Sequence, residues 1–348
     1  MRKSFMAMSV MFVLVIALVL PTLAQEGAPA MEMPPLPGEV VLENVAAPRG
    51  LAFDADGNLI VALAGSGGDL PLGESPDGAT TMAGMSGSIV SIDADGVVTD
   101  IMTGIPSFQG PMEATGVYRV IPHNGKLWIV TSAALGTVYG NSIVEYDPVT
   151  RLIGTTINVG AFEAENNPDG NEIDSNVADI AWDADGLMYI VDAGANTLYT
   201  WTQADGLTGI VSWPENSVPD SIEIADNGDI YIGHLGTGLA PGGAKVEHWS
   251  NGEVVKTFAG LTSVTDILLT SDGQLYAVEL INFGEQGPGP GRVISLPEDG
   301  EATAVAEGLI APFALAEGPD GAIYVSYGTI PFAPGMMGGV IRLDISGM

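Results

Sequence analysis

The sequence predicts an all-β fold, a six-bladed β-propeller, and three observations support this. A pattern of apolar run, Asp-Gly or Asn-Gly turn and second apolar run occurs six times along the 348 residues. Asp-Gly and Asn-Gly supply the positive φ angles of tight hairpins, and the Val, Ile, Leu and Tyr around them favour strands. The repeats are spaced more widely than a hairpin requires, which is typical of four-stranded blades of about 40 to 50 residues.

The chain begins with the features of an export signal. Arg2 and Lys3 precede an apolar run over residues 5–20, and a small residue, Ala24, follows. We therefore expect a signal peptide over residues 1–24 and export to the periplasm or out of the cell. An uncleaved membrane anchor is the alternative, because the run is close to the minimum of roughly 17 residues for a spanning helix. No basic flank follows the run, which favours cleavage and no membrane insertion of the mature chain.

The rest of the chain divides into a tether and one domain. Residues 25–39 are rich in Pro, Ala and Gly, have no hydrophobic period, and predict a flexible tether. Residues 40–348 are expected to form a single propeller, since a closed all-β fold of this length need not be divided. The last repeat stops one strand short after residues 338–348, while residues 40–45 have no blade of their own. We expect this N-terminal strand to complete the last blade and close the ring without free edges.

The turns and the longer connections of the repeats differ in length. The turns close at Gly57, Gly125, Gly186, Gly228, Gly273 and Gly321, which lie 42 to 68 residues apart. The Asp-Gly turns are short, whereas connections after the second strand of a repeat are long, as in residues 64–87, 281–291 and 327–339. Long loops gathered on one face of a rigid scaffold are where binding usually resides, so the loop-rich face is the predicted binding face.

The composition excludes some partners. The formal net charge is −33, and the chain contains no cysteine. So acidic a protein is unsuited to nucleic acid or an anionic membrane surface, and its charge serves either solubility or the attraction of cations and cationic ligands. Without cysteine an exported chain must be stabilised by packing and strand pairing. We expect a monomer whose ligand is a small molecule, a glycan or a protein.

Counting back from the turn glycines places six residues at one register of the inner strands, where they should ring the channel mouth. They are Gly50, Tyr118, Asp179, Ser221, Asp266 and Ala314. A second ring, two residues further along, is apolar except for Glu223. Other polar residues come just before the first ring or end the second strands. The predicted binding residues are Arg49, Tyr118, Ser221, His234 and Glu279.

The acidic segment FEAENNPDGNEIDSNVADIAW, residues 162–182, runs into the third repeat and reaches the same opening. Hard cations prefer carboxylate and amide oxygens, so a calcium site is predicted from Asp174, Asn176, Asp179, Asp220 and Asp266. A polar channel without metal explains the same residues, because Asp, Asn and Ser also satisfy backbone groups where strands begin. The DADG turns are not EF-hand loops, since their glycine stands at position four instead of six.

Catalytic signatures are missing from the sequence. It contains no GxSxG elbow, no HExxH motif and no cysteine nucleophile, and its three histidines share no ligand spacing. The first hypothesis is therefore an exported binding or scaffolding propeller that uses the loop-rich face. The alternative is a metal-dependent, lactonase-like hydrolase with calcium at the channel mouth. A third hypothesis is a structural surface protein in which the tether acts as a spacer.

Several segments resemble the ScyD/ScyE family, bacterial proteins named after members encoded with scytonemin biosynthesis genes. The resemblance covers residues 40–348 and is carried by PRGLAFDADGNLIVA, EAENNPDGNEIDSN, VDAGANTLYTW, LAPGGAKVEHW and TDILLTSDGQLYAVE. It implies an exported six-bladed propeller, related in architecture to NHL-repeat and gluconolactonase-like proteins. It implies no reaction, because the family offers no activity that can be carried onto residues of this chain.

Overall fold

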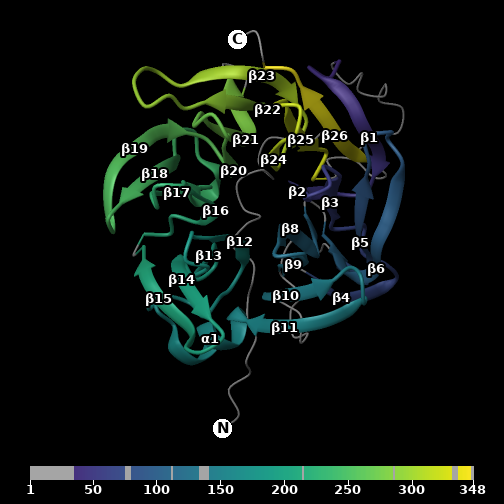
Figure 1. The fold of residues 1–348 in the computed structure, drawn as a ribbon, viewed down its shortest axis with the longest axis horizontal. Helices are drawn as coiled ribbons and strands as arrows, with labels where there is room; N and C mark the ends of the chain where they lie inside the picture. The colour runs from purple at the N-terminus through teal and green to yellow at the C-terminus, as the bar shows by residue number, and fades with distance from the viewer. Residues whose placement is uncertain are drawn as a thin grey trace.

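The strands form six sheets in a ring around a central channel, which confirms the six-bladed β-propeller (Figure 1). The computed structural model describes residues 35–74, 80–110, 113–132, 141–213, 215–284, 287–330 and 336–345. The predicted signal peptide and most of the predicted tether lie outside these residues. Within the described ranges, no helix has both the length and the apolar character needed to cross a membrane.

Each blade is an antiparallel sheet whose first strand lines the channel. The first blade contains β2 (Pro48–Phe53), β3 (Leu59–Leu63), β5 (Thr80–Ile92), β6 (Val98–Gln109) and β7 (Ala114–Thr115), with β4 (Leu70–Glu74) paired to β5. The second contains β8 (Val117–His123), β9 (Lys126–Thr131), β10 (Ser142–Asp147) and β11 (Leu152–Asn158). The third contains β12 (Val177–Trp182), β13 (Met188–Asp192), β14 (Thr197–Thr202) and β15 (Gly206–Ser212).

The other three blades follow the same plan. The fourth contains β16 (Pro219–Ile224), β17 (Ile230–His234), β18 (Ala244–Ser250) and β19 (Glu253–Leu261). The fifth contains β20 (Val264–Leu269), β21 (Leu275–Gly284), β22 (Gly287–Ser295) and β23 (Thr303–Leu309). The sixth contains β24 (Leu315–Glu317), β25 (Ile323–Tyr327), β26 (Gly338–Leu343) and β1 (Glu39–Val45). Two short helices, α1 (Val159–Asn166) and the 3₁₀ helix η2 (Thr237–Leu239), lie in connections between strands.

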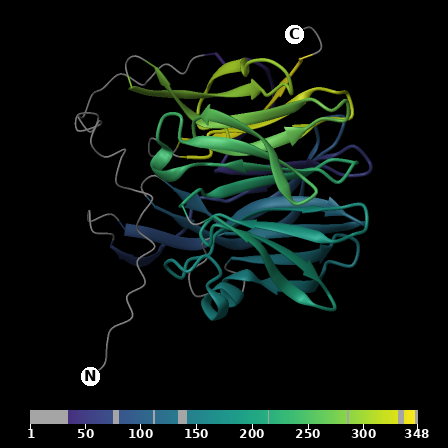
Figure 2. The same ribbon diagram turned by 90° about the vertical axis from the view of Figure 1, so that its left-hand side faces the viewer.

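The sixth blade combines the two ends of the described domain. β1 pairs antiparallel with β26, so that Glu39 lies opposite Arg342 and Val45 opposite Gly338. β1 is thus the outermost strand of this blade and pairs with the edge of β26 that would otherwise be free. Figure 2 shows the same ring of sheets from the side.

The hairpin turns between the first and second strands of the blades form as their sequences predict, with one difference in length. In the third blade the Asp183 carboxylate accepts hydrogen bonds from the N–H groups of Asp185 and Leu187, and Gly186 has φ +83°. In the second blade only Asn124 and Gly125 separate the paired strands, with φ angles of 52° and 72°. Positive φ at both positions is typical of the two-residue type I′ turn. This shorter turn changes the register of the channel wall.

Apolar side chains fill the space between neighbouring blades. Side chains from several blades are completely buried, including Val61, Ile89, Ile190, Val278 and Val325. Burying such a side chain contributes about 1.5 to 3 kcal/mol relative to leaving it exposed. The stability of the described chain therefore depends on strand pairing and on packing between blades, in agreement with the absence of cysteine.

Candidate functional site in the central channel

The register of the channel wall differs from the sequence prediction in the second blade. Asp179 pairs with Val191, and the equivalent pair in the second blade is Arg119 with Val130. The reason is turn length: two residues separate the paired strands in the second blade and five in the third. The register predicted for Tyr118 is therefore wrong by one residue. Arg119 takes that position in the ring, and no counting from the glycine alone can reveal it.

Two adjacent layers of side chains face the channel because the inner strands are irregular at this depth. Five of these strands, β2, β8, β12, β16 and β20, shift register next to the two layers. Such bulges re-aim side chains, so consecutive residues can both reach the channel. The plug layer, nearer the loop-rich face, comprises Arg49, Tyr118, Ala178, Asp220, Thr265 and Phe313. The floor layer, one residue further along, comprises Gly50, Arg119, Asp179, Ser221, Asp266 and Ala314.

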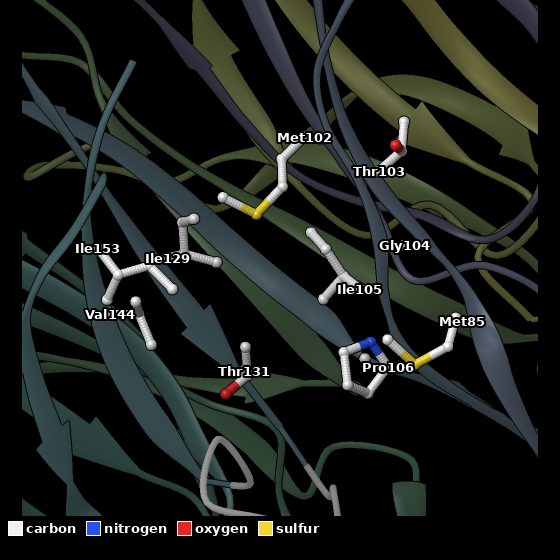
Figure 3. A pocket seen from close by; sticks show the side chains of 11 residues that line it. Met85, Met102, Thr103, Gly104, Ile105, Pro106, Ile129, Thr131, Val144 and Ile153 are labelled. Carbon is white, nitrogen blue, oxygen red and sulfur yellow. The ribbon is translucent and has the colours of Figure 1, made fainter. Parts of the chain in front are cut away.

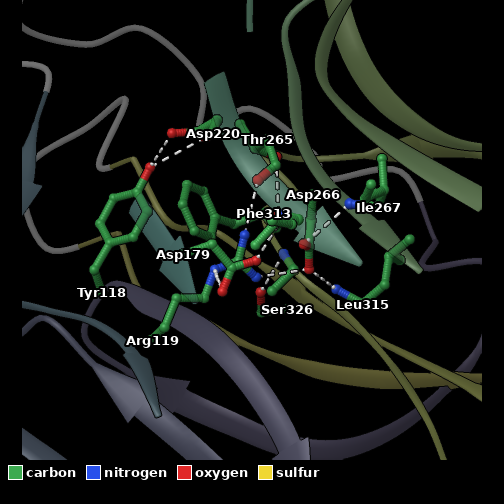
Figure 4. A network of polar contacts seen from close by, with 12 residues as sticks. Tyr118, Arg119, Asp179, Asp220, Thr265, Asp266, Ile267, Phe313, Leu315 and Ser326 are labelled. Carbon is green, nitrogen blue, oxygen red and sulfur yellow. Dashed lines mark hydrogen bonds and ion pairs between the residues drawn. The ribbon is translucent and has the colours of Figure 1, made fainter. Parts of the chain in front are cut away.

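The plug layer fills the channel on the side of the loop-rich face. Phe313 is 2% exposed and packs edge-on against Tyr118, with ring centroids 5.0 Å apart. The guanidinium carbon of Arg49 lies 4.5 Å from the Phe313 ring centroid and 5.2 Å from that of Tyr118. The Tyr118 hydroxyl donates a hydrogen bond of 2.9 Å to Asp220 (Figure 4). Burial raises the pKa of Asp220 to about 7, although Arg119 and the bond from Tyr118 act in the opposite direction.

The floor layer is organised around Arg119. Its Nη1 atom lies 2.7 Å from Asp266 Oδ2, its Nε atom lies 3.8 Å from Asp179 Oδ1, and its Nη2 atom donates to the Thr265 carbonyl at 3.0 Å (Figure 4). All three ionisable side chains are buried. Burial alone would lower the pKa of Arg119, but the two aspartates hold it above its usual value. The guanidinium thus remains charged between them.

The two aspartates of the floor layer also connect neighbouring blades. Asp179 of the third blade accepts a hydrogen bond from the N–H of Ile222 in the fourth, at 3.2 Å. Asp266 of the fifth blade accepts one from the N–H of Leu315 in the sixth, at 2.8 Å. Burial raises the pKa of both carboxyl groups, while Arg119 lowers it. Because burial outweighs the effect of Arg119, these carboxyl groups keep a proton more readily than an exposed aspartate does.

A cavity of about 520 Å³ extends from the floor layer toward the Asp-Gly turns, and we call it the channel cavity. Arg119, Asp179 and Asp266 line its inner end. Small side chains of the next ring, Ala52, Ala181 and Ala316, leave this part of the channel open. The half-buried rim, next to the turns, is formed by Phe53, His123, Trp182, Asp183, Ile224 and Glu317.

Acidic side chains outnumber basic ones in the channel cavity. Five acidic residues and one arginine are among those that line it: Asp179, Asp183, Glu223, Asp266, Glu317 and Arg119. Within the described residues Glu223 forms no ion pair. Burial raises the pKa of Glu223 well above its usual value, and the neighbouring Asp266 and Asp179 raise it further. Glu223 therefore holds a proton in the wall of the cavity more readily than an exposed glutamate does.

The five predicted binding residues are buried, and they contact the protein's own groups. His234 is completely buried, and its Nδ1 atom lies 2.8 Å from the Ser217 hydroxyl. Glu279 accepts a hydrogen bond of 2.7 Å from the Thr262 N–H and pairs with Arg292 at 2.5 Å. None of the five is more than 7% exposed: Arg49, Tyr118, Ser221, His234 and Glu279. A ligand on the loop-rich face would meet them only after a rearrangement.

The five predicted metal ligands do not form one cluster. Asp179 and Asp266 meet around Arg119, and Asp220 is bonded to Tyr118. Asp174 is exposed, whereas the Asn176 N–H donates to Asp192 at 2.7 Å. Among the described residues, no three or more His, Cys, Asp or Glu side chains are arranged to hold a metal ion. At the point where carboxylates converge, the guanidinium of Arg119 occupies the position of a cation, so these residues do not fit calcium.

Comparisons with known proteins support the fold and show no function. No family model matches the chain, and no curated protein sequence matches it. Among solved structures, a gluconolactonase from Xanthomonas campestris has a TM-score of 0.55 and 9% identity over 87% of this chain and 88% of that one. A protein described as an oxidoreductase (glucose dehydrogenase), from Thermus thermophilus, has a TM-score of 0.54 and 16% identity, covering 89% and 100%. A luciferin-regenerating enzyme has a TM-score of 0.54 and 12% identity, covering 90% and 96%.

These structural neighbours are six-bladed propeller proteins. At such low identities the likeness shows the fold alone.

Proposed function

We propose that the protein is an exported binding propeller whose channel cavity holds a small organic cation. The observation that carries this proposal is the excess of acid in the cavity: five acidic side chains and one arginine line about 520 Å³. Phe53 and Trp182 at the rim add aromatic faces, to which organic cations are attracted. The net charge of −33 raises the local concentration of cations around the whole molecule.

An ammonium group suits this cavity better than a metal ion does. Calcium takes six to eight oxygen ligands, whereas oxygens of Asp179 and Asp266 already accept bonds from Arg119 and from backbone N–H groups. An ammonium group needs only a few acceptors and tolerates an irregular arrangement of them. Glu223 forms no ion pair among the described residues, and its carboxyl group has the backbone N–H of Leu269 as a partner. A cation beside it favours the ionised carboxylate, so binding is expected to release a proton.

The proposed ligand binds on the face of the propeller that carries the Asp-Gly turns, whereas the sequence alone favoured the loop-rich face. Its support is steric, because the plug layer fills the channel on one side while alanines leave it open on the other. Export after removal of residues 1–24, a monomeric state and membership of the ScyD/ScyE family are further parts of this proposal. They depend on the sequence segments described above. Nucleic acid is not among the expected partners.

Calorimetric titration with 1,4-diaminobutane tests the proposal, and 1,4-butanediol is the uncharged control of the same length. We expect saturable binding of the diamine at pH 7.5 and none of the diol. Glu223→Gln should weaken binding at least tenfold, which corresponds to about 1.4 kcal/mol. Glu301→Gln, at an exposed position outside the cavity, makes the same chemical substitution and should leave the Kd unchanged. Equal binding of the diol, or equal weakening by the two substitutions, would refute a charge-selective cavity.

One observation supports a hydrolase as the second candidate function. Glu223 is an acid with a strongly raised pKa beside a cavity, and such a group can protonate a leaving oxygen. One of the structural neighbours is a gluconolactonase by name. The described residues do not fit a metal ion, so this candidate function depends on Glu223 itself. Turnover of a panel of lactones that is abolished by Glu223→Gln would support it; no turnover, and no metal by elemental analysis, would remove it.

A further inference from the structure

A second cavity lies between the first and second blades, outside the central channel (Figure 3). Its volume is about 230 Å³. Strands β5 and β6 of the first blade form one wall, and strands β9, β10 and β11 of the second blade form the other. We call it the inter-blade pocket, and its main walls are the side chains of Met85, Met102, Ile105, Ile129, Val144 and Ile153.

A bulge in the outer part of the first blade accompanies this opening. Ser88 pairs with Thr103 and Gly87 pairs with Ile105, which leaves Gly104 as an extra residue in β6. Gly104 has φ +73°, and a Cβ atom added to it would meet nothing within 4 Å. A glycine bulge of this kind bends the strand and increases its twist. The bend explains why the two blades do not close against each other here.

The inner end of the pocket belongs to the packed core between the two blades. Ile105, Ile129 and Val144 are 8%, 3% and 5% exposed and are members of one hydrophobic cluster. The outer end is open, since Met85 is 62% exposed and Ile153 is 50% exposed. Branched aliphatic side chains therefore form a fixed floor. The unbranched methionines at the mouth can adjust to an occupant.

The lining contains no ionisable side chain. The hydroxyl of Thr131 is already used, because it donates to the Ser142 carbonyl at 3.2 Å. Within the described part of the chain, the buried polar side-chain atoms that have no partner all lie outside this pocket. Water therefore finds few partners in it, and apolar cavities of this kind accept apolar molecules instead.

We propose that the inter-blade pocket is a binding site for a small, uncharged, apolar molecule. A cavity of about 150 Å³ accepts benzene, so by proportion this pocket has room for about nine carbon atoms. A substituted benzene ring or a small bicyclic ring system has this size. The deep, two-sided walls fit a small molecule rather than the flat surface of a protein. The proposal is independent of the channel cavity, whose lining is acidic.

Titration with indene, followed by the methyl signals of Met85 and Met102 in methionine-labelled protein, tests this site. We expect saturable shifts of these two signals. Met102→Trp should fill the pocket and weaken binding at least tenfold. Val255→Trp, at a position 58% exposed on the fourth blade, is the matched control and should leave the Kd unchanged. If the Met102 variant does not fold, Ile153→Trp at the mouth provides the same obstruction.

Charge selectivity supplies the second readout. The ammonium compound 2-aminoindane has nearly the shape of indene, and at pH 7 it should bind the inter-blade pocket at least tenfold more weakly. Absence of saturable shifts with indene, an unchanged Kd in both obstructed variants, or equal binding of the ammonium compound would overturn the proposal.

Discussion

The two halves of the central channel are built on the same six strands, yet one is filled and the other is hollow. On the side of the loop-rich face, Phe313, Tyr118 and Arg49 pack against one another across the axis. Toward the Asp-Gly turns, alanines such as Ala52 and Ala181 stand at the corresponding depth, and about 520 Å³ stays open. Side-chain volume, rather than loop length, therefore decides which half of the channel is open.

The acids of the two halves differ in the same way. Asp220 in the plug layer accepts a hydrogen bond from the Tyr118 hydroxyl, and the two aspartates of the floor layer both pair with Arg119. Glu223 in the cavity wall forms no ion pair among the described residues and has a strongly raised pKa. Paired acids stabilise the ring, whereas an acid without an ionic partner is available to a ligand. This distinction predicts substitutions that change stability without binding, and the reverse.

Removing the guanidinium from the floor layer should have the largest effect on stability. Arg119→Met leaves two buried carboxyl groups without their counter-ion, a loss that typically costs about 3 to 5 kcal/mol. Urea unfolding at pH 7.5 measures it. Arg342→Met breaks a partly exposed ion pair of 2.6 Å with Asp320 and should cost less than about 1 kcal/mol. Similar costs for the two variants would mean that Arg119 does not hold the floor together.

The hydrogen bond in the plug layer should have the next largest effect. Tyr118→Phe leaves Asp220 without its hydroxyl donor, and we expect a loss of about 1 to 3 kcal/mol. A double-mutant cycle with Asp220→Asn separates this bond from the packing of the ring. Additive effects of the two substitutions would show that the hydroxyl and the carboxyl group are not coupled.

Stability should rise as the pH falls from about 7 to 5. The pKa values of Asp220 and Glu163 are raised to about 7, in both cases mainly by burial. A raised pKa in the folded state contributes stability that is complete below the unfolded pKa and is lost as the pH rises through the folded value. Raising one pKa by a single pH unit corresponds to about 1.4 kcal/mol, so an increase of at least this size is expected in urea unfolding. Asp220→Asn should flatten the profile, whereas lower stability at pH 5 than at pH 7.5 would contradict it.

The smallest effect on stability should come from the cavity itself. Because burial favours the uncharged form of Glu223, the neutral Glu223→Gln should change the free energy of unfolding by less than about 1 kcal/mol. The same variant should lose cation binding, as described above. A large destabilisation without any change in binding would assign Glu223 to the scaffold and remove the contrast between the two halves.

The repeated turns predict most of the fold, because hairpin chemistry and strand composition are local properties. The register of the inner strands around the channel is a less local property than the turns are. It depends on the number of residues between the paired strands, and the two-residue turn at Asn124 and Gly125 shifts the second blade so that Arg119 replaces Tyr118. A correction for turn length would have revealed this arginine among the acids. The hollow half is harder to predict, since it depends on the volume of Phe313 against that of Ala316 across a closed ring.

A crystal structure of the protein with 4-bromobenzylammonium tests the central claim most directly, because the anomalous signal of bromine locates the ligand without assumptions. We predict one strong bromine peak inside the channel cavity, with the ammonium group beside Glu223 and no peak within the plug layer. A bromine site on the loop-rich face, or an empty cavity in crystals saturated with the compound, would contradict the account.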